Sequence, residues 1–211
     1  MTNVLIVDDH PIVRRGLKEI LKTESNLHVS ETANARDALA LIRQQPFDLV
    51  VLDLDLPGMS GLELLQQIKH EQKRLHVLVL SVYPEDQFAV RVLKAGASGF
   101  ISKEAVPDQL ITAVRRILGG GKHISERVAD LLLQHFGGQQ DEHLHEKLSD
   151  REFQILCLLG EGKTIKQIAQ ELSLSAPTVS TYRARILDKM DMRTTAELVR
   201  YAIQNRIASP R

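Results

Sequence analysis

The sequence predicts a doubly wound α/β domain, with a five-stranded parallel sheet like that of flavodoxin, followed by a small all-α domain. Over the first 120 residues, short apolar runs alternate with stretches of helical spacing. Apolar runs rich in Val, Ile and Leu are typical of strands buried on both faces of a parallel sheet. Five such runs alternating with five helical stretches indicate the doubly wound fold. After Leu148 no strand pattern occurs, so the rest is expected to be helical.

The expected strands are short apolar runs, and the second is the weakest. They are expected at residues 4–7, 27–30, 49–52, 77–80 and 99–101.

Helical spacing between these runs places apolar side chains on one face of each expected helix. In the first helix, Ile12, Gly16, Ile20 and Leu21 are expected to share a face. The later sets are Ala38, Leu41 and Ile42; Leu62, Leu65 and Ile68; Val90, Leu93 and Lys94 before Gly96; and Leu110, Val114 and Ile117 before the glycines at 119–121.

These patterns divide the chain into a first domain at 1–121, a connecting region at 122–147 and a second domain at 148–211. Within the connecting region a helix is expected at 125–136, and the polar stretch Gly137–His143 is typical of a flexible linker.

Four helices are expected in the second domain, at 149–159, 164–172, 176–190 and 194–205. Ser149 stands three residues before Glu152, which predicts a capping box. Ser175 precedes Pro177, a residue that is tolerated in the first turn of a helix.

Composition is ordinary, with 43% hydrophobic and 26% charged residues and a net charge of zero. No apolar run approaches the ~18–20 residues that a membrane span needs, and no signal peptide is evident at the start. The single cysteine, Cys157, lies in an apolar run. We therefore expect a soluble cytoplasmic protein without a membrane association. Residues 148–211 carry ten basic and seven acidic side chains, which is compatible with binding phosphates.

Acidic side chains follow two of the expected strands. Asp8 and Asp9 come after the first strand and Asp53 after the third. Ligand sites in parallel sheets form at the carboxyl ends of the strands, so these carboxylates are expected to meet there and to hold Mg²⁺. The fourth strand ends at Ser81 and the fifth near Lys103. A carboxylate nucleophile with a metal, a hydroxyl and an ammonium indicates a phosphoryl-transfer site.

Two other interpretations of these acids compete with this one. An acidic residue at a strand end is often only a helix cap, although five suitable residues at consecutive positions disfavour that explanation. The pair Asp53 and Asp55 also occurs in haloacid-dehalogenase-like phosphatases. In that family the pair follows the first strand and the metal-binding acids come later, so the order here disfavours an enzyme of that kind.

Several segments of residues 1 to about 120 resemble receiver domains. They are Val7-Asp8-Asp9-His10-Pro11, the run from Leu52 to Gly61, Leu80-Ser81, and Gly96 to Lys103. The resemblance implies that Asp53 accepts phosphate from a histidine kinase and that Asp9 and Asp53, with Asp8 close by, bind Mg²⁺.

The same resemblance implies that Ser81 and Lys103 hold the phosphoryl oxygens. Phe100 would be an aromatic switch that turns inward when Ser81 moves, although a plain core phenylalanine is the alternative. Asp55 adds a negative charge where many receivers have a neutral side chain, and Glu104 stands where many have proline.

The second domain resembles the LuxR-type helix-turn-helix, from Lys147-Leu148-Ser149 through Thr178–Tyr182. The scaffold helix is expected at Ile165–Leu172, the turn at 173–175 and the recognition helix at Ala176–Met190. At ~100° per residue, Val179, Ile186 and Met190 form its buried stripe.

The opposite side of the recognition helix is expected to enter the major groove. The candidate base contacts are Ser180, Thr181, Ala184 and Arg185, and only Arg185 can contact guanine with two hydrogen bonds. A solvated surface arginine is the alternative. The candidate phosphate contacts are Thr178, Lys163, Lys166 and Lys189. Arg183, beside the buried stripe, is expected to pair with an acid.

Together the two halves resemble the NarL/FixJ family of two-component response regulators. This implies transcription control through double-stranded DNA, a sensor histidine kinase as partner, a homodimer when phosphorylated or DNA-bound, and no catalysis beyond its own phosphotransfer and dephosphorylation. The alternative is a regulator of the same fold that binds DNA or a protein without phosphorylation.

Overall fold

The computed structural model describes residues 1–211 apart from 84, 137–143, 206 and 208–211. The chain divides into two compact units, Met1–Gly137 and Gly138–Arg211. The polar stretch Gly137–His143, expected to be a flexible linker, lies outside the described residues.

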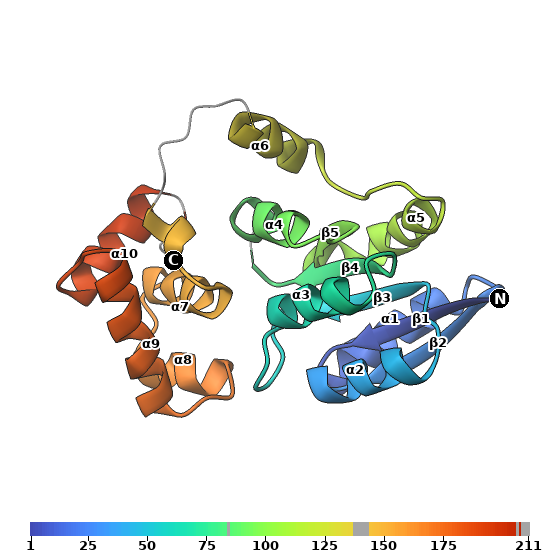
Figure 1. Ribbon diagram of the computed structural model, residues 1–211, viewed down its shortest axis with the longest axis horizontal. Helices are drawn as coiled ribbons and strands as arrows, with labels where there is room; N and C mark the ends of the chain where they lie inside the picture. Colours follow the sequence, from blue (N-terminus) through green and yellow to red (C-terminus); the bar gives the residue numbers. More distant parts are fainter. Residues whose placement is uncertain (84, 137–143, 206, 208–211) are drawn as a thin grey trace. The chain divides into compact units, whose positions relative to one another are not determined.

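The first unit contains the five-stranded parallel sheet that the sequence predicts, in the order β2-β1-β3-β4-β5 (Figure 1). Its strands are β1 Thr2–Val7, β2 Leu27–Thr32, β3 Leu49–Asp53, β4 His76–Ser81 and β5 Gly99–Ser102. Every residue of β3 is buried, because helices cover both faces of the sheet. The strand order reverses at β1 and β3, which is where doubly wound sheets form their ligand sites.

The helices of this unit form two layers. They are α1 Pro11–Leu21, α2 Ala35–Gln44, α3 Gly61–Glu71, α4 Glu85–Lys94 and α5 Val106–Leu118, with a short 3₁₀ turn η1 Lys103–Ala105. Helices α1 and α5 pack on one face of the sheet, where Leu17, Leu21 and Leu110 join the aliphatic side chains of the strands. Helices α2 and α3 contact each other on the opposite face (Figure 1).

The core-facing side of α1 differs from the one expected. Leu17 and Leu21 are buried, and Val13 and Ile20 pack partly against them. Ile12 is 87% exposed, and Gly16 is exposed as well. The spacing of four residues from Val13 through Leu17 to Leu21 sets the contact with the sheet, and Ile12 lies about 100° away from Val13 around the helix.

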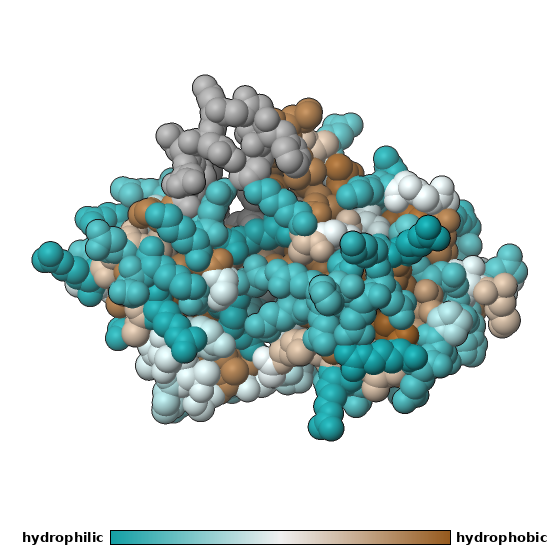
Figure 2. Space-filling view, in the orientation of Figure 1, coloured by the Kyte–Doolittle hydropathy of each residue, from teal (hydrophilic) through white to brown (hydrophobic). Residues whose placement is uncertain are grey.

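After α5 the chain returns to the sheet beside β5. His123 forms a parallel bridge with Gly99, and its carbonyl oxygen accepts a hydrogen bond of 3.1 Å from the backbone N–H of Phe100. A side chain at Gly99 would meet that carbonyl oxygen at 2.8 Å, so the close approach requires glycine. Helix α6, Glu126–Phe136, follows and packs against α4. Its Val128 is buried, while Leu133 is exposed, and Figure 2 shows hydrophobic side chains gathered near the top of the view, over α6.

The second unit is helical among its described residues, as expected. It contains the 3₁₀ turn η2 Leu144–Lys147 and helices α7 Asp150–Gly160, α8 Ile165–Glu171, α9 Ala176–Lys189 and α10 Thr195–Gln204. Each helix end lies within one residue of its expected place. The capping box of Ser149 and Glu152 is present, and the Ser175 side chain caps α9. Within the described part of the chain, no helix is long and apolar enough to cross a membrane.

Candidate functional site

Strand pairing brings the acidic residues together at the carboxyl edge of the sheet. Val7 of β1 lies opposite Leu52 of β3, so the next residues, Asp8 and Asp53, lie side by side. Both carboxylates are only 1% exposed, whereas the side chain of Asp9 is 30% exposed. The sheet topology therefore buries two negative charges next to each other, an arrangement that needs a compensating positive charge.

Lys103 supplies that positive charge from the end of β5. Its Nζ donates hydrogen bonds to Asp8 Oδ2 at 2.8 Å and to Asp53 Oδ2 at 2.7 Å. Burial disfavours the charged ammonium, but the attraction of Asp53 and Asp8 is stronger, and the pKa of Lys103 is raised. Lys103 is therefore a fixed cation, held 50 residues along the chain from the carboxylate it contacts.

The pKa of Asp53 reflects how deeply it is buried. The pKa of this carboxyl is raised to about 7, chiefly because burial disfavours the charged form; Lys103 lowers the pKa, and the negative charges of Asp8 and Asp55 raise it. Ionisation of a buried carboxyl is costly by itself, but it becomes favourable when a cation binds beside the carboxylate.

The oxygen atoms around Asp53 fit a divalent cation. One ligand atom from each of Asp8, Asp9, His10 and Asp53 lies within 4.8 Å of the others. Asp53 Oδ1 is buried and has no hydrogen-bond partner among the described residues, whereas Asp9 Oδ1 lies 2.6 Å from His10 Nδ1. A buried carboxylate oxygen without a donor, in a cluster of carboxylates, is the environment that hard dications favour.

Ser81 ends β4 and is fully buried. Its Oγ accepts a hydrogen bond of 3.0 Å from the backbone N–H of Tyr83. The Tyr83 hydroxyl in turn donates to Asp55 Oδ1 at 3.1 Å. Sequence reasoning did not find this link between the loops after β3 and β4, because nothing in the spacing of Asp55 and Tyr83 indicates that they meet.

Phe100 lies on β5 opposite Val79 and is 1% exposed. Its neighbour Ile101 belongs to the core on the α1 and α5 face, so the ring of Phe100 faces the other side of the sheet. A buried ring is compatible both with the expected switch and with a plain core phenylalanine.

In the second unit α8 and α9 form the helix-turn-helix pair, joined by residues 172–175, where Ser173 has a positive φ of 51°. Val179, Ile186 and Met190 are buried, as the helical angles predict. On the other side of α9, Ser180, Thr181, Ala184 and Arg185 are all exposed. The Thr181 hydroxyl donates to the Pro177 carbonyl, which leaves its oxygen free to accept.

The basic residues expected near phosphates differ in their surroundings. Lys189 donates to Glu152 at 2.7 Å, and Lys163 pairs with Glu171 at 2.8 Å and with Glu161 at 3.0 Å. Lys166 is exposed at the start of α8. To contact a phosphate, Lys163 and Lys189 would have to give up these ion pairs with glutamates. Lys166 has no such pair among the described residues, so its contact would break none.

Two further side chains of this unit hydrogen-bond within it. Thr178 shares a hydrogen bond of 2.7 Å with Ser175 at the helix start. Arg183, expected to pair with an acid, donates to the Thr195 hydroxyl at 3.1 Å instead. The partner of the Arg183 guanidinium is therefore a hydroxyl at the start of α10, and not the carboxylate that was expected.

Comparison with known proteins separates the two units in the same way. Residues 4–115 match the response regulator receiver domain, and residues 146–202 match the bacterial regulatory proteins of the luxR family. The response regulator GacA of Pseudomonas aeruginosa is 35% identical over 207 residues, which covers 97% of each chain.

Among solved structures, RcsB from Salmonella enterica serovar Typhimurium bound to the promoter rprA in the presence of phosphomimetic BeF3⁻ is 25% identical. It has a TM-score of 0.62, covering 95% of this chain and 98% of that one. A structure of two RcsB dimers bound to two parallel DNAs is 26% identical, with a TM-score of 0.59 over 95% of this chain and 97% of that one.

Proposed function

Because this chain belongs to the two-component response regulators, with a receiver domain and a LuxR-type DNA-binding domain, we propose that phosphorylation of Asp53 controls how its helix-turn-helix binds DNA. The observation that carries the proposal is the burial of Asp53 beside Asp8, with Lys103 bonded to both. No structural purpose requires two buried carboxylates at a sheet edge, where an apolar pair would cost less.

In the proposed reaction an oxygen of Asp53 forms a bond to phosphorus while the bond from phosphorus to an imidazole nitrogen of the sensor kinase breaks. Lys103 Nζ, 2.7 Å from Asp53, is placed to stabilise the charge on the phosphoryl oxygens. The product is an acyl phosphate, and the protein needs no other catalysis than its own phosphotransfer and dephosphorylation.

We assign Mg²⁺ to the carboxylates of Asp9 and Asp53, with Asp8 beside them. The ion, when bound, would neutralise the acids and the incoming phosphate. The buried oxygen Asp53 Oδ1, which has no hydrogen-bond partner among the described residues, supports this assignment.

The proposed switch begins at Ser81. Its hydroxyl accepts from the Tyr83 N–H, and moving towards a phosphoryl oxygen would exchange that bond for a stronger one to a charged group. Phe100 would then take up the space that the β4 end leaves, on the face that α4 covers. Phosphate biases this face only by binding one arrangement better than the other.

On the DNA side we propose that α9 enters the major groove, with Ser180, Thr181, Ala184 and Arg185 towards the bases and Thr178, Lys163, Lys166 and Lys189 towards phosphates. The RcsB dimers bound to DNA support a homodimer on double-stranded DNA here too. A sensor histidine kinase as partner and a place in the cytoplasm complete the proposal.

The competing function is DNA binding without phosphorylation. That function would not use the buried carboxylates or Lys103. Burying such a charged cluster is costly, so its presence favours the phosphorylation proposal.

The test is labelling of the full chain with a small phosphodonor and Mg²⁺. We expect one acid-labile and base-labile phosphate, lost in Asp53→Asn and kept in Asp48→Asn, whose carboxylate precedes the opposite end of β3. Label uptake by Asp53→Asn at the wild-type rate would refute the assignment.

A further inference from the structure

His10 stands at an unusual place for its residue type. It is the N-cap of α1, a position that favours Ser, Thr, Asp or Asn because their short side chains accept hydrogen bonds from the first turn. The His10 side chain makes no such bond. Helix formation therefore does not explain the imidazole.

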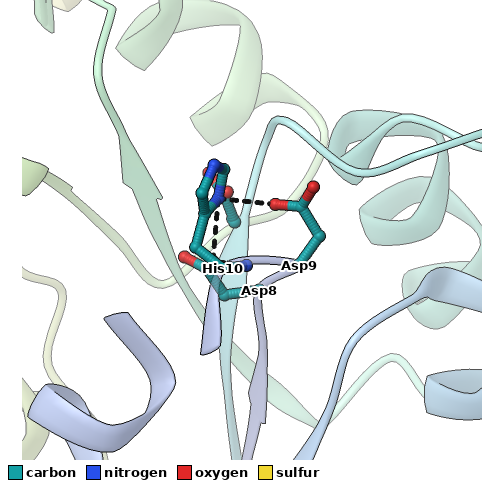
Figure 3. Close-up of side chains that lie close together, drawn as sticks. Asp8, Asp9 and His10 are labelled. Carbon is teal, nitrogen blue, oxygen red and sulfur yellow. Dashed lines mark hydrogen bonds and ion pairs between the residues drawn. The ribbon is translucent and has the colours of Figure 1, made fainter. Parts of the chain in front are cut away.

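The ring turns instead towards the acidic cluster (Figure 3). His10 Nδ1 lies 2.6 Å from Asp9 Oδ1 and 3.4 Å from Asp8 Oδ1. The backbone N–H of His10 also donates to Asp8 Oδ1 at 2.8 Å, which fixes the residue against the cluster. The imidazole nitrogen is thus held beside the atoms that would ligate a metal.

The two separations measured from His10 are close to those of a coordination shell. With metal–ligand bonds of about 2.1 Å, neighbouring ligands of an octahedral ion are about 3.0 Å apart and opposite ones about 4.2 Å. The distances of 2.6 and 3.4 Å lie on either side of the first value. The four ligand atoms of Asp8, Asp9, His10 and Asp53 lie within 4.8 Å of one another.

An independent observation shows which oxygen the cluster leaves for a cation. Asp53 is only 1% exposed, and Lys103 bonds its Oδ2. Its Oδ1 is buried without a hydrogen-bond partner among the described residues. A buried carboxylate oxygen lacking a donor is costly unless something positive reaches it.

We propose that His10 donates an imidazole nitrogen to the dication held by Asp9 and Asp53, so that the site prefers transition-metal ions such as Co²⁺ and Mn²⁺ to Mg²⁺. The inference rests on the proposed metal site and adds to it a ligand and a selectivity. Mg²⁺ favours oxygen ligands, whereas imidazole favours transition metals, and affinity rises from Mn²⁺ to Co²⁺. The His10 side chain is 62% exposed, so it can adjust to the ion without disturbing the core.

The decisive measurement is pulsed electron paramagnetic resonance of Mn²⁺ bound to the full chain. We expect the modulation of a directly bound ¹⁴N in the wild-type chain, and its loss in His10→Ala. His28→Ala, which removes another exposed histidine of the same unit, is the matched control and should keep the signal. Asp53→Asn should release the ion and so locate it.

Titration calorimetry supplies the selectivity. Removing even a group that only orients a metal ligand typically costs about 10–100-fold in metal affinity. We therefore expect His10→Ala to lower the Co²⁺ affinity about tenfold, at the lower end of that range. The Mg²⁺ affinity should change little.

Bound Mn²⁺ that Asp53→Asn releases but that shows no ¹⁴N modulation would overturn the role of His10 and leave the metal site intact. Equal losses for Co²⁺ and Mg²⁺ in His10→Ala would overturn the selectivity. Failure of the wild-type chain to bind any of the three ions would instead reject the metal site itself.

Discussion

At the scale of single residues, the charge on Asp53 sets the chemistry of the first unit. The folded chain raises the pKa of this carboxyl from 3.8 to about 7, chiefly through burial. Between these two values the folded chain keeps a proton that the unfolded chain has released. The stabilisation is therefore complete below about pH 4 and is lost as the pH rises through about 7.

This linkage predicts how Asp53→Asn behaves in metal-free buffer. The amide cannot ionise, so the stability of the variant relative to the wild-type chain should rise as the pH increases from about 4 to about 7. Denaturant unfolding at several pH values measures the difference. Mg²⁺ should narrow it, because the ion favours the ionised carboxylate. A difference that stays constant across this range would contradict the burial of an ionisable Asp53.

A second residue-scale prediction concerns the recognition helix. Arg185 is exposed on the groove side, with its guanidinium 5.9 Å from the centre of the Tyr182 ring. Arg185→Ala should cost about 1–3 kcal/mol at one base position if it contacts guanine. Lys166→Ala should weaken all sequences alike and flatten the salt slope by roughly one unit. Binding measured on matched sites at several salt concentrations separates the two, and equal, sequence-independent losses would make Arg185 a phosphate contact.

At the scale of elements, two glycines make opposite demands. Gly61 begins α3 directly against the end of β3, where an added Cβ would overlap the Asp53 carbonyl and come within 2.6 Å of Leu54 Cα. Gly16 lies within α1 with open space around it.

Gly61→Ala should therefore destabilise the first unit by about 1–3 kcal/mol and slow labelling of Asp53, because the backbone of Asp53 and Leu54 must shift. Gly16→Ala should stabilise it by about 0.5–1 kcal/mol, since alanine loses less backbone entropy in a helix. Thermal and denaturant unfolding of both variants give the signs. A neutral or stabilising Gly61→Ala would show that the loop is less constrained than its contacts indicate.

The sequence predicts elements better than it predicts their faces. Strands and helices follow from apolar periodicity, and the site residues follow from strand ends, so the sequence alone suffices to group Asp8, Asp53 and Lys103. It does not suffice for the face of α1, because Ile12 and Val13 are both apolar and only packing decides between them. Contacts that join separate loops, such as Tyr83 with Asp55, depend on tertiary geometry that no local pattern encodes.

At the scale of the whole molecule, the two units carry different tasks, and the way phosphate couples them can be measured. The unit beginning at Gly138 keeps the hydrogen bond of 3.0 Å between His145 and the Tyr201 hydroxyl. It also has its own buried core, including Leu156, Ile168 and Leu198. We expect residues 138–211 to fold alone and to bind DNA without phosphate.

If the unphosphorylated receiver masks α9, this fragment should bind at least as tightly as the unphosphorylated full chain, and phosphorylation should raise the affinity of the full chain or its dimerisation. One titration of the fragment and both full-length forms decides. Phosphorylation that changes neither affinity nor dimerisation would mean that the receiver signals through another partner.

Hybrid regulators are made by joining one protein's receiver to another's DNA-binding helices, and the return of the chain onto β5 decides where such a join belongs. A crossover at residue 121 would replace His123, whose carbonyl accepts from the Phe100 N–H and lies against Gly99. It would also exchange α6, which packs on α4. A crossover beyond residue 136 keeps these contacts within one protein. The receiver part of such a hybrid therefore extends past α5 and includes both the segment at His123 that pairs with β5 and helix α6.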